Sequence, residues 1–396
     1  MLLQNTTKPI HIALHKDLKR AIKRGHAWLY SDAIDLRPAA SGSVALLHDR
    51  KDEIIACGIY DASHPIPLRV CRTQPPFILD DAWVASQLSK AIALRQLAFD
   101  PTVTNGYRIV AGEGDGLPGL IIDLYDRTAV IKLDGGAPEA FYRPQGLADW
   151  LRDNLQAHCV VLRTRQRGRV GEALVGTPPE APVEFLENGL IFSADVLQGQ
   201  KTGFFLDQRD NRALIQSLSR GRSVLNLFSF NGGFSVAAGR GGASDVTSVD
   251  LAAPAIAAAS THWEMNQLQQ PHHAVVQDCF EFLQSAIRGR ENWDLVICDP
   301  PSFAPSEKTR QQGLTAYTKL AQLAAQVTRP GGMLALASCS SHVGELAFTQ
   351  ANLDGLGRAR RQATVLSNRS LPIDHPTPMA MPELRYLKFQ LLQLDA

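Results

Sequence analysis

The fold class is decided by the stretch Asp294-Leu295-Val296-Ile297-Cys298-Asp299-Pro300-Pro301-Ser302-Phe303, together with the later stretch Ala337-Ser338-Cys339-Ser340. Each is an apolar run that stops at polar residues, which is typical of a strand buried on both faces whose carboxyl end opens into a site. From about residue 224 onward, strand patterns alternate with helical patterns, which predicts a doubly wound parallel sheet. Ligands bind outside the carboxyl ends of such strands, and neighbouring strands lie only about 5 Å apart. We therefore expect Asp299 and Cys339 to face one substrate.

The composition is that of a folded protein with two or three domains. The chain has 396 residues, of which 45% are hydrophobic and 20% charged, whereas one domain ordinarily holds roughly 100 to 200 residues. The net charge is only +1, so any interaction with nucleic acid must depend on local clusters of charge. No apolar run reaches the roughly 20 residues that span a bilayer, and residues 1–7 lack the pattern of a signal peptide. We expect a cytoplasmic protein without a membrane partner.

The cysteines are spread along the chain without the short spacing of zinc or redox sites, so we expect reduced thiols and no metal. Cys298 lies inside the apolar run before Asp299, which favours a core position for this thiol. Cys339 follows a strand and is the better candidate for a nucleophile. The six cysteines are Cys57, Cys71, Cys159, Cys279, Cys298 and Cys339.

Proline clusters near residues 75 and 180 predict three domains, at residues 1–75, 76–180 and 181–396. The first domain has strand-like runs at 43–48, 54–60 and 68–72. It also has a basic cluster before residue 25, which is either the solvated face of a helix or a surface that contacts RNA phosphates. On the second interpretation the RNA contacts come from Lys19, Arg20, Lys23 and Arg24.

The middle domain begins with a helical pattern at 81–99, whose predicted core positions are Trp83, Leu88, Ile92 and Leu97. The glycine-rich segment 112–120 lacks the lysine of a phosphate loop and leads into a strand, which predicts a tight hairpin. A second basic run follows at 163–169. It is either a solvated loop or a contact with the RNA backbone through Arg163, Arg165 and Arg167.

Three strand tips of the last domain predict a site for a nucleoside-type cofactor. The first strand runs into Phe228-Ser229-Phe230-Asn231-Gly232-Gly233-Phe234, where the glycines let a ligand approach the backbone at a helix amino end. The turn is not G-x-G-x-x-G, which disfavours a dinucleotide. Asp250 ends the second strand, where an acid commonly binds ribose hydroxyls. Asp278 ends the third, either as an acceptor for an exocyclic amine or as a helix cap.

Four segments in combination carry a resemblance to a known family: Gln198 to Arg212, Asn226 to Val236, Asp299-Pro300-Pro301-Ser302-Phe303, and Ser338-Cys339-Ser340. Their arrangement resembles the class I S-adenosylmethionine-dependent methyltransferases. More narrowly, the chain is similar to the bacterial large-subunit ribosomal RNA methyltransferase I family, which makes 5-methylcytosine in 23S rRNA. The likeness covers nearly the whole chain, because the segments 24–31 and 113–120 match the family's amino-terminal and central domains. Asn231 departs from the family, where threonine is expected, but both side chains are small and polar.

This resemblance implies an amino-terminal β-barrel-like PUA domain that binds RNA, a small central α/β domain and a carboxyl-terminal Rossmann-like methyltransferase domain. It also implies that the segment 201–212 forms a loop over S-adenosylmethionine, with Phe204 and Phe205 as packing walls. From the residues alone, that segment is only an amphipathic turn with aromatic side chains. The cofactor contacts expected from both lines of argument are Lys201, Thr202, Phe204, Asp207, Gln208, Arg209, Phe228, Ser229, Gly232, Gly233, Asp250, Asp278, Asp299 and Pro300.

The same resemblance, together with the chemistry of cytosine, predicts covalent catalysis by Cys339. Carbon 5 becomes nucleophilic only after a thiolate adds to carbon 6. Asp299 would then hydrogen-bond the edge of the ring, and Pro300 would stiffen the loop. The base that removes the carbon 5 proton is not identified by the sequence.

Several alternatives stay open at this point. The Asp-Pro-Pro motif also suits methylation of guanine N2, and related enzymes methylate carbon 5 of uridine. A non-catalytic RNA-binding factor in ribosome assembly would keep the same fold. The expected partner is 23S rRNA or a precursor of the large subunit, and whether the chain forms a homodimer is open.

Overall fold

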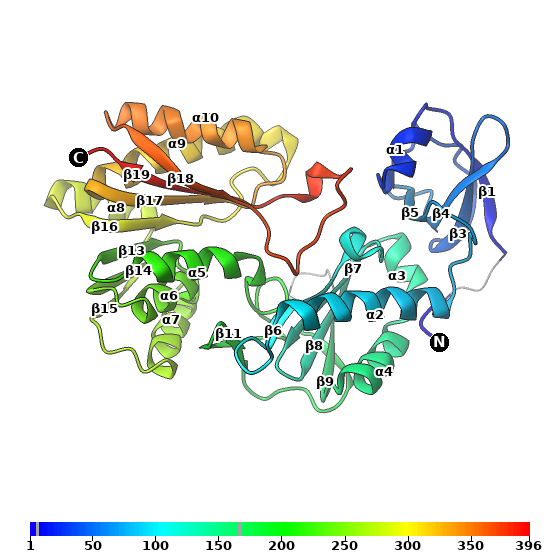
Figure 1. Ribbon diagram of the computed structural model, residues 1–396, viewed down its shortest axis with the longest axis horizontal. Coiled ribbons are helices and arrows are strands. Elements are labelled where there is room, and N and C mark those ends of the chain that lie inside the picture. The colour runs from blue at the N-terminus through cyan, green and yellow to red at the C-terminus, as the bar shows by residue number, and fades with distance from the viewer. Residues whose placement is uncertain (5–7, 165–167) are drawn as a thin grey trace. The chain divides into compact units, whose positions relative to one another are not determined.

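The computed structural model describes residues 1–4, 8–164 and 168–396, which divide into two compact units (Figure 1). The amino-terminal unit comprises Met1–Gly189, Ser193–Leu206 and Ile373–Leu384. The carboxyl-terminal unit comprises Leu190–Phe192, Asp207–Pro372 and Arg385–Ala396. The predicted division into three domains at residues 75 and 180 stays a prediction. Within the described ranges, no helix has both the length and the hydropathy that crossing a bilayer requires.

The first sheet of the amino-terminal unit has five strands in the order β1-β3-β4-β5-β2. Strands β3 to β5 coincide with the three strand-like runs expected from the sequence, which confirms a β-rich start of the chain. β1 pairs with β3 in parallel, and the remaining pairs are antiparallel. The elements are β1 (Ile10–Ala13), α1 (Lys19–Lys23), β2 (Trp28–Leu29), β3 (Ser43–His48), β4 (Ile54–Tyr60) and β5 (Leu68–Arg72).

The second sheet of this unit has the order β10-β9-β8-β7-β6. β6 and β7 are antiparallel, so the hairpin predicted for the glycine-rich segment is confirmed. The connection is longer than a tight turn, because residues 112–119 lie between the strands and include the 3-10 turn η1. The elements are α2 (Asp81–Ala98), β6 (Gly106–Ala111), η1 (Gly112–Asp115), β7 (Leu120–Tyr125), β8 (Thr128–Leu133), α3 (Ala137–Phe141), α4 (Pro144–Leu155), β9 (Cys159–Arg163), β10 (Glu172–Val175) and, beyond the sheet, β11 (Val183–Glu187). The next strand, β12 (Leu190–Ala194), is divided, because Leu190–Phe192 belongs to the carboxyl-terminal unit.

Helix α2 corrects one expectation about the core. Trp83 and Leu88 are buried, but Leu97 is 88% exposed, so its predicted core position is wrong. The buried positions Val84, Leu88, Ala91 and Arg95 follow one face of the helix. Two residues beyond Arg95 the helix has turned by roughly 200°, so Leu97 points to the opposite side.

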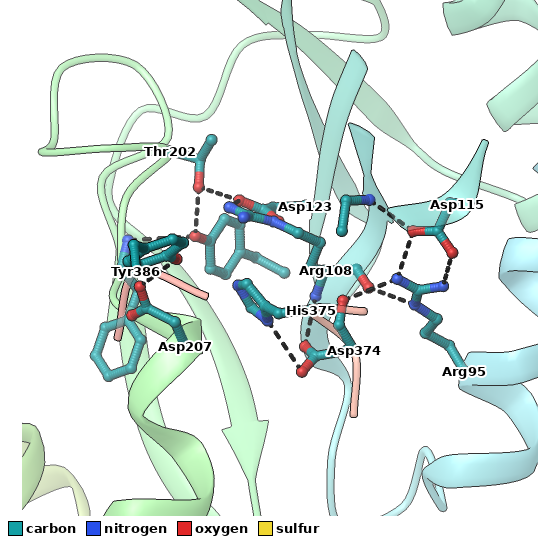
Figure 2. A network of polar contacts seen from close by, with 12 residues as sticks. Arg95, Arg108, Asp115, Asp123, Thr202, Asp207, Asp374, His375 and Tyr386 are labelled. Atoms are coloured by element: carbon teal, nitrogen blue, oxygen red, sulfur yellow. Dashed lines mark hydrogen bonds and ion pairs between the residues drawn. The ribbon is translucent and has the colours of Figure 1, made fainter. Parts of the chain in front are cut away.

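Arg95 takes the last inward position of α2 and lies at one end of the polar network in Figure 2. Its guanidinium donates to both carboxylate oxygens of Asp115, at 2.6 and 2.8 Å. It also donates to the carbonyl oxygens of Ala91, Arg108 and Asp374. All five N–H groups of the guanidinium therefore have an acceptor. Asp374 belongs to the segment 373–384, which returns to the amino-terminal unit from the far end of the chain.

The carboxyl-terminal unit is built on one seven-stranded sheet in the order β15-β14-β13-β16-β17-β19-β18. β13 to β17 are parallel, as expected, whereas β19 runs antiparallel to both of its neighbours. The strands are β13 (Ser223–Leu227), β14 (Asp245–Asp250), β15 (His272–Val276), β16 (Trp293–Cys298), β17 (Thr328–Ser338), β18 (Ala363–Arg369) and β19 (Lys388–Leu394).

Helices cover both faces of this sheet (Figure 1). β16 shows the consequence, because Leu295 and Ile297 pack into the core beneath α5 to α7, whereas Val296 and Cys298 pack into the core beneath α8 to α10. The prediction of a strand buried on both faces is therefore confirmed. The helical elements are η2 (Leu206–Gln208), α5 (Arg209–Leu218), α6 (Gly233–Arg240), α7 (Ala253–Met265), α8 (Cys279–Gly289), η3 (Glu307–Thr309), α9 (Arg310–Val327), α10 (Glu345–Arg358) and, in the returning segment, η4 (Pro382–Leu384).

Candidate active site

The strand register brings the predicted site residues to one edge of the sheet. Leu227 at the end of β13 lies opposite Val249 of β14 and Cys298 of β16. Cys298 in turn lies opposite Leu336 of β17. The turn after β13, the acid that ends β14, the Asp-Pro-Pro loop after β16 and the thiol after β17 therefore all leave the same edge.

The turn after β13 has an unusual backbone. Phe228 and Phe230 adopt positive φ angles of 54° and 48°, which cost energy for residues other than glycine and often mark functional sites. Asp250 stabilises this turn, because its carboxylate accepts hydrogen bonds from the backbone N–H of Phe230 at 2.9 Å and of Ala252 at 2.9 Å. The acid at the tip of β14 thus fixes the shape of the turn beside it.

Gly232 ends this turn at a φ of 77°, and a Cβ there would lie 2.7 Å from the Cβ of Ala259 in α7. Its lack of a side chain is therefore required for helix packing, a role that the sequence did not reveal. A direct contact between Gly232 or Gly233 and a cofactor stays a prediction.

Two buried polar atoms near this turn have no hydrogen-bond partner within the described part of the chain. They are Oγ of Ser229, in a side chain with 6% exposure, and Oδ1 of Asn226. Buried polar groups are almost always satisfied, so an unpaired hydroxyl at a strand tip suits a ligand with polar edges. The residues present therefore fit a nucleoside cofactor.

Asp278 is a helix cap, as one of the two interpretations of the sequence proposed. Its Oδ1 accepts from the backbone N–H of Phe280 at 2.9 Å and of Glu281 at 3.0 Å, at the start of α8. The second carboxylate oxygen accepts no hydrogen bond from the described residues. Capping and ligand binding are therefore compatible here.

An aromatic cluster borders the same edge. The rings of Phe228, Phe280 and Phe303 pack pairwise, with centroids 6.1 to 6.2 Å apart, and Tyr317 of α9 lies 4.9 Å from Phe303. Sequence reasoning did not identify Phe280 or Tyr317 as site residues, because each lies in a helical pattern that also fits the core.

A chain of hydroxyl groups connects the Asp-Pro-Pro loop to the tip of β17. The Oγ of Ser340 lies 3.0 Å from Oγ of Ser302 and 2.8 Å from the hydroxyl of Tyr317. The Oγ of Ser338 donates to the same Tyr317 hydroxyl at 2.9 Å. Burial raises the pKa of Tyr317, so this hydroxyl keeps its proton. The network fixes the residues on both sides of Cys339.

The thiols around the site differ in accessibility. Cys339 is half-buried, whereas Cys279 and Cys298 are buried, which confirms the expected core position of Cys298. Burial raises the pKa of Cys279 to about 12 and that of Cys298 well above its ordinary value. Only the thiolate is a nucleophile, so Cys339 is the best candidate among these three.

The segment 201–212, expected to cover the cofactor, begins among polar residues of the amino-terminal unit (Figure 2). The hydroxyl of Thr202 donates to Asp123 at 2.6 Å, and the backbone N–H of Phe204 donates to the Tyr125 hydroxyl at 3.2 Å. The ammonium of Lys201 lies 4.4 Å from the centroid of the Phe205 ring. Thr202 and Phe204 are buried.

The remainder of this segment lies in the carboxyl-terminal unit. Asp207, Gln208 and Arg209 are buried there, and the Tyr386 hydroxyl donates to Asp207 at 2.7 Å. Cofactor contacts by Lys201 to Arg209, and by Asp299 and Pro300, stay predictions.

The predicted RNA-binding residues fall into four groups. Arg20, Lys23 and Arg24 are exposed. Lys19 forms ion pairs with Asp49 and with Glu53, and the hydrogen bond from Lys19 lowers the pKa of Asp49 to about 2. Arg163 donates to the carbonyl oxygens of Val196 and Gly199, at 3.1 and 2.8 Å. Arg165 and Arg167 lie outside the described residues.

Comparison with protein families gives two matches. The family described as S-adenosylmethionine-dependent methyltransferase matches residues 147–349, and the PUA-like domain matches residues 12–73.

Among the relatives, the ribosomal RNA large subunit methyltransferase of Deinococcus radiodurans is 40% identical over 98% of each chain. The ribosomal RNA large subunit methyltransferase I of Photobacterium profundum is 33% identical over 95% of this chain and 97% of its own. A solved structure from Streptococcus mutans, described as an S-adenosylmethionine-dependent methyltransferase, has the same fold with a TM-score of 0.83. It is 24% identical and covers 97% of this chain and 100% of its own. A methyltransferase structure in complex with S-adenosylhomocysteine gives a TM-score of 0.85 at 24% identity, with the same coverage.

Proposed function

Since this chain belongs to the ribosomal RNA large subunit methyltransferase I family of S-adenosylmethionine-dependent methyltransferases, we propose that it methylates carbon 5 of a cytosine in 23S rRNA. The reaction proceeds through a covalent adduct with Cys339. The observation that carries this proposal is the half-buried Cys339 after β17, held by the hydroxyl network between Ser302, Ser340 and Tyr317.

Carbon 5 of cytosine is too weak a nucleophile to take a methyl group directly. The enzyme must therefore first add a nucleophile of its own to the ring. The cofactor supplies an electrophilic methyl group on a sulfonium. The thiolate of Cys339 forms a bond to carbon 6, which makes carbon 5 electron-rich enough to take the methyl group. Removal of the carbon 5 proton then allows the carbon–sulfur bond to break. The ring regains its aromaticity, and the thiolate of Cys339 is restored.

Asp299 and the prolines after it serve the target base. We assign the Asp299 carboxylate to the hydrogen-bonding edge of the ring, and Pro300 and Pro301 to one wall of its pocket. Carbon 6 is not accessible to a thiolate within a stacked helix, so the cytosine is single-stranded or turned out of the helix.

The identity of the methylated nucleoside tests this proposal. Unmodified 23S rRNA is incubated with the full chain and labelled S-adenosylmethionine, and the digested nucleosides are separated by mass spectrometry. We expect 5-methylcytidine. If the label appears in N2-methylguanosine or 5-methyluridine, the methylated base is guanine or uracil, and the proposal of cytosine is wrong. If the rRNA stays unlabelled and calorimetry detects no cofactor binding, the alternative of a non-catalytic assembly factor is favoured.

Ser229 is expected to contribute to cofactor affinity without contributing to stability. Replacing Ser229 with alanine removes a hydroxyl without a partner among the described residues, so the free energy of unfolding should change little. The dissociation constant of S-adenosylmethionine, measured by calorimetry, should rise by roughly 2- to 10-fold, the equivalent of one hydrogen bond.

Ser235→Ala is the matched control for Ser229→Ala. The Ser235 hydroxyl is buried and already contacts Asn226 and Ser248, so this variant should lose stability with little change in affinity. An unchanged dissociation constant for Ser229→Ala would contradict the assignment of Ser229 to the cofactor site.

We propose that the exposed residues Arg20 and Lys23 of α1, and Arg24 directly after the helix, contact RNA phosphates. Substituting glutamine for both Lys23 and Arg24 should weaken binding of 23S rRNA and reduce the slope of log K against log salt by about 2. The control is Lys90→Gln, an exposed lysine of α2. If the slope of log K against log salt is the same for the double variant and the control, Lys23 and Arg24 do not contact the RNA.

A further inference from the structure

Lys388 is a buried lysine at the tip of the strand next to Cys339. It begins β19 and lies directly opposite Ser338 in the antiparallel register with β17, so the two side chains project from the same face of the sheet. Lys388 is only 6% exposed. Its Nζ donates to the carbonyl oxygen of Ser340 at 2.6 Å and to that of Tyr386 at 2.7 Å. The ammonium is thereby fixed against the residue that follows Cys339.

This ammonium has no counter-charge within ion-pair distance in the described part of the chain. Both acceptors are neutral carbonyls, and one of the three N–H groups has no acceptor among the described residues. A buried charge without a partner is costly. Burial accordingly lowers the pKa of Lys388 to about 8, while the charge of Cys339 acts in the opposite direction and raises it. The cost falls when an anion forms nearby.

The other titratable groups around Lys388 do not supply that anion. Tyr317 of α9 keeps its proton because burial raises its pKa. The Tyr386 hydroxyl donates to Asp207 at 2.7 Å. In β18, Arg369 is exposed and donates to the carbonyl oxygen of Asp210. Cys339 is the group whose ionisation acts on Lys388.

We propose that the Lys388 ammonium stabilises the thiolate of Cys339 and so prepares the nucleophile, an inference that rests on the covalent reaction proposed above. The proton of the thiol passes to solvent, and the ammonium keeps its three protons. The sulfur lone pair then forms the bond to carbon 6. When that bond breaks, the thiolate returns to the same ammonium. Lys388 is therefore a positioning residue that acts through Cys339.

The pairing sets a pH window for the reaction. The thiolate of Cys339 forms as pH rises, whereas the ammonium of Lys388 is lost as pH passes about 8. Methyl transfer should therefore show a bell-shaped pH dependence whose alkaline side lies near pH 8. In Lys388→Arg the charge persists above that pH, so the alkaline decline should disappear.

The direct test is the rate at which iodoacetamide alkylates Cys339 in the full chain, measured against pH by mass spectrometry of the peptide. Lys388→Gln keeps hydrogen-bond donors for the two carbonyls but removes the charge. We expect its alkylation midpoint to move up by at least about one pH unit, an effect typical of a neighbouring charge. The rate below the midpoint should then fall about tenfold. Lys388→Arg should stay close to the wild type, and so should the control Lys319→Met, an exposed lysine of α9.

An alkylation profile of Lys388→Gln that matches the wild type would overturn the inference. If the lysine variants do not fold, the wild type still decides, because carbon-13 NMR can follow the titration of Lys388 before and after alkylation of Cys339. Loss of the thiolate should lower the Lys388 midpoint, and an unchanged midpoint overturns the pairing. These readouts need no RNA. If the alkylation midpoint moves in Lys388→Gln but the wild type forms no 5-methylcytidine, the pairing of Lys388 with Cys339 stands and only the proposed substrate is wrong.

Discussion

Replacing Cys339 with alanine is expected to abolish methyl transfer to 23S rRNA, with a loss of more than about 1,000-fold in rate. The physical reason is that carbon 5 of cytosine has no other route to nucleophilicity, so the variant loses the whole covalent pathway. The measurement is transfer of labelled methyl at saturating cofactor. Cofactor affinity should stay near that of the wild type, because the turn after β13 and Asp250 are untouched.

The matched control for Cys339→Ala is Cys298→Ala. Cys298 is fully buried in the core beneath α8 to α10, so its loss should lower stability slightly and leave most of the activity. RNA that carries 5-fluorocytidine provides a second readout. The fluorine takes the place of the proton that must leave, so the adduct with the wild type persists and Cys339→Ala forms none. Methylation by Cys339→Ala at the wild-type rate would mean that the reaction is not covalent.

Replacing Asp115 with alanine is expected to lower the free energy of unfolding of the amino-terminal unit by about 3 to 5 kcal/mol. The Arg95 guanidinium is 1% exposed and donates to both oxygens of Asp115. Without the carboxylate, a buried positive charge has no counter-charge in that contact. The backbone N–H of Ala111 also loses its acceptor, the Oδ2 of Asp115 at 2.7 Å. Urea unfolding followed by tryptophan fluorescence measures the change.

A surface pair in the same unit provides the control for Asp115→Ala. Arg152 and Asp153 also lie within salt-bridge distance, but their side chains are 49% and 62% exposed. Asp153→Ala should therefore lower the free energy of unfolding far less than Asp115→Ala does. If the two variants lose similar amounts of stability, burial does not determine how much an ion pair contributes to the free energy of unfolding.

Much of the fold and part of the site followed from local patterns. The apolar run before Asp299 predicted a strand buried on both faces, and β16 is such a strand. The glycine-rich segment after β6 predicted a hairpin, which the antiparallel pair β6 and β7 confirms. These features are encoded locally, because alternation and turn chemistry depend on residues a few positions apart. Leu97 was misplaced because it lies roughly 200° around the helix from Arg95 and therefore outside the buried face.

The sequence by itself determined that strands and helices alternate from about residue 224 onward, and it identified the strand tips that carry Asp250, Asp299 and Cys339. Only the tertiary structure decided which distant residues join them. Lys388 lies beside the tip of β17 because β19 inserts antiparallel between β17 and β18. Arg95 meets the carbonyl oxygen of Asp374 because the segment 373–384 returns to the amino-terminal unit. Neither contact can be predicted from the spacing of residues along the sequence, because each depends on how whole elements pack together.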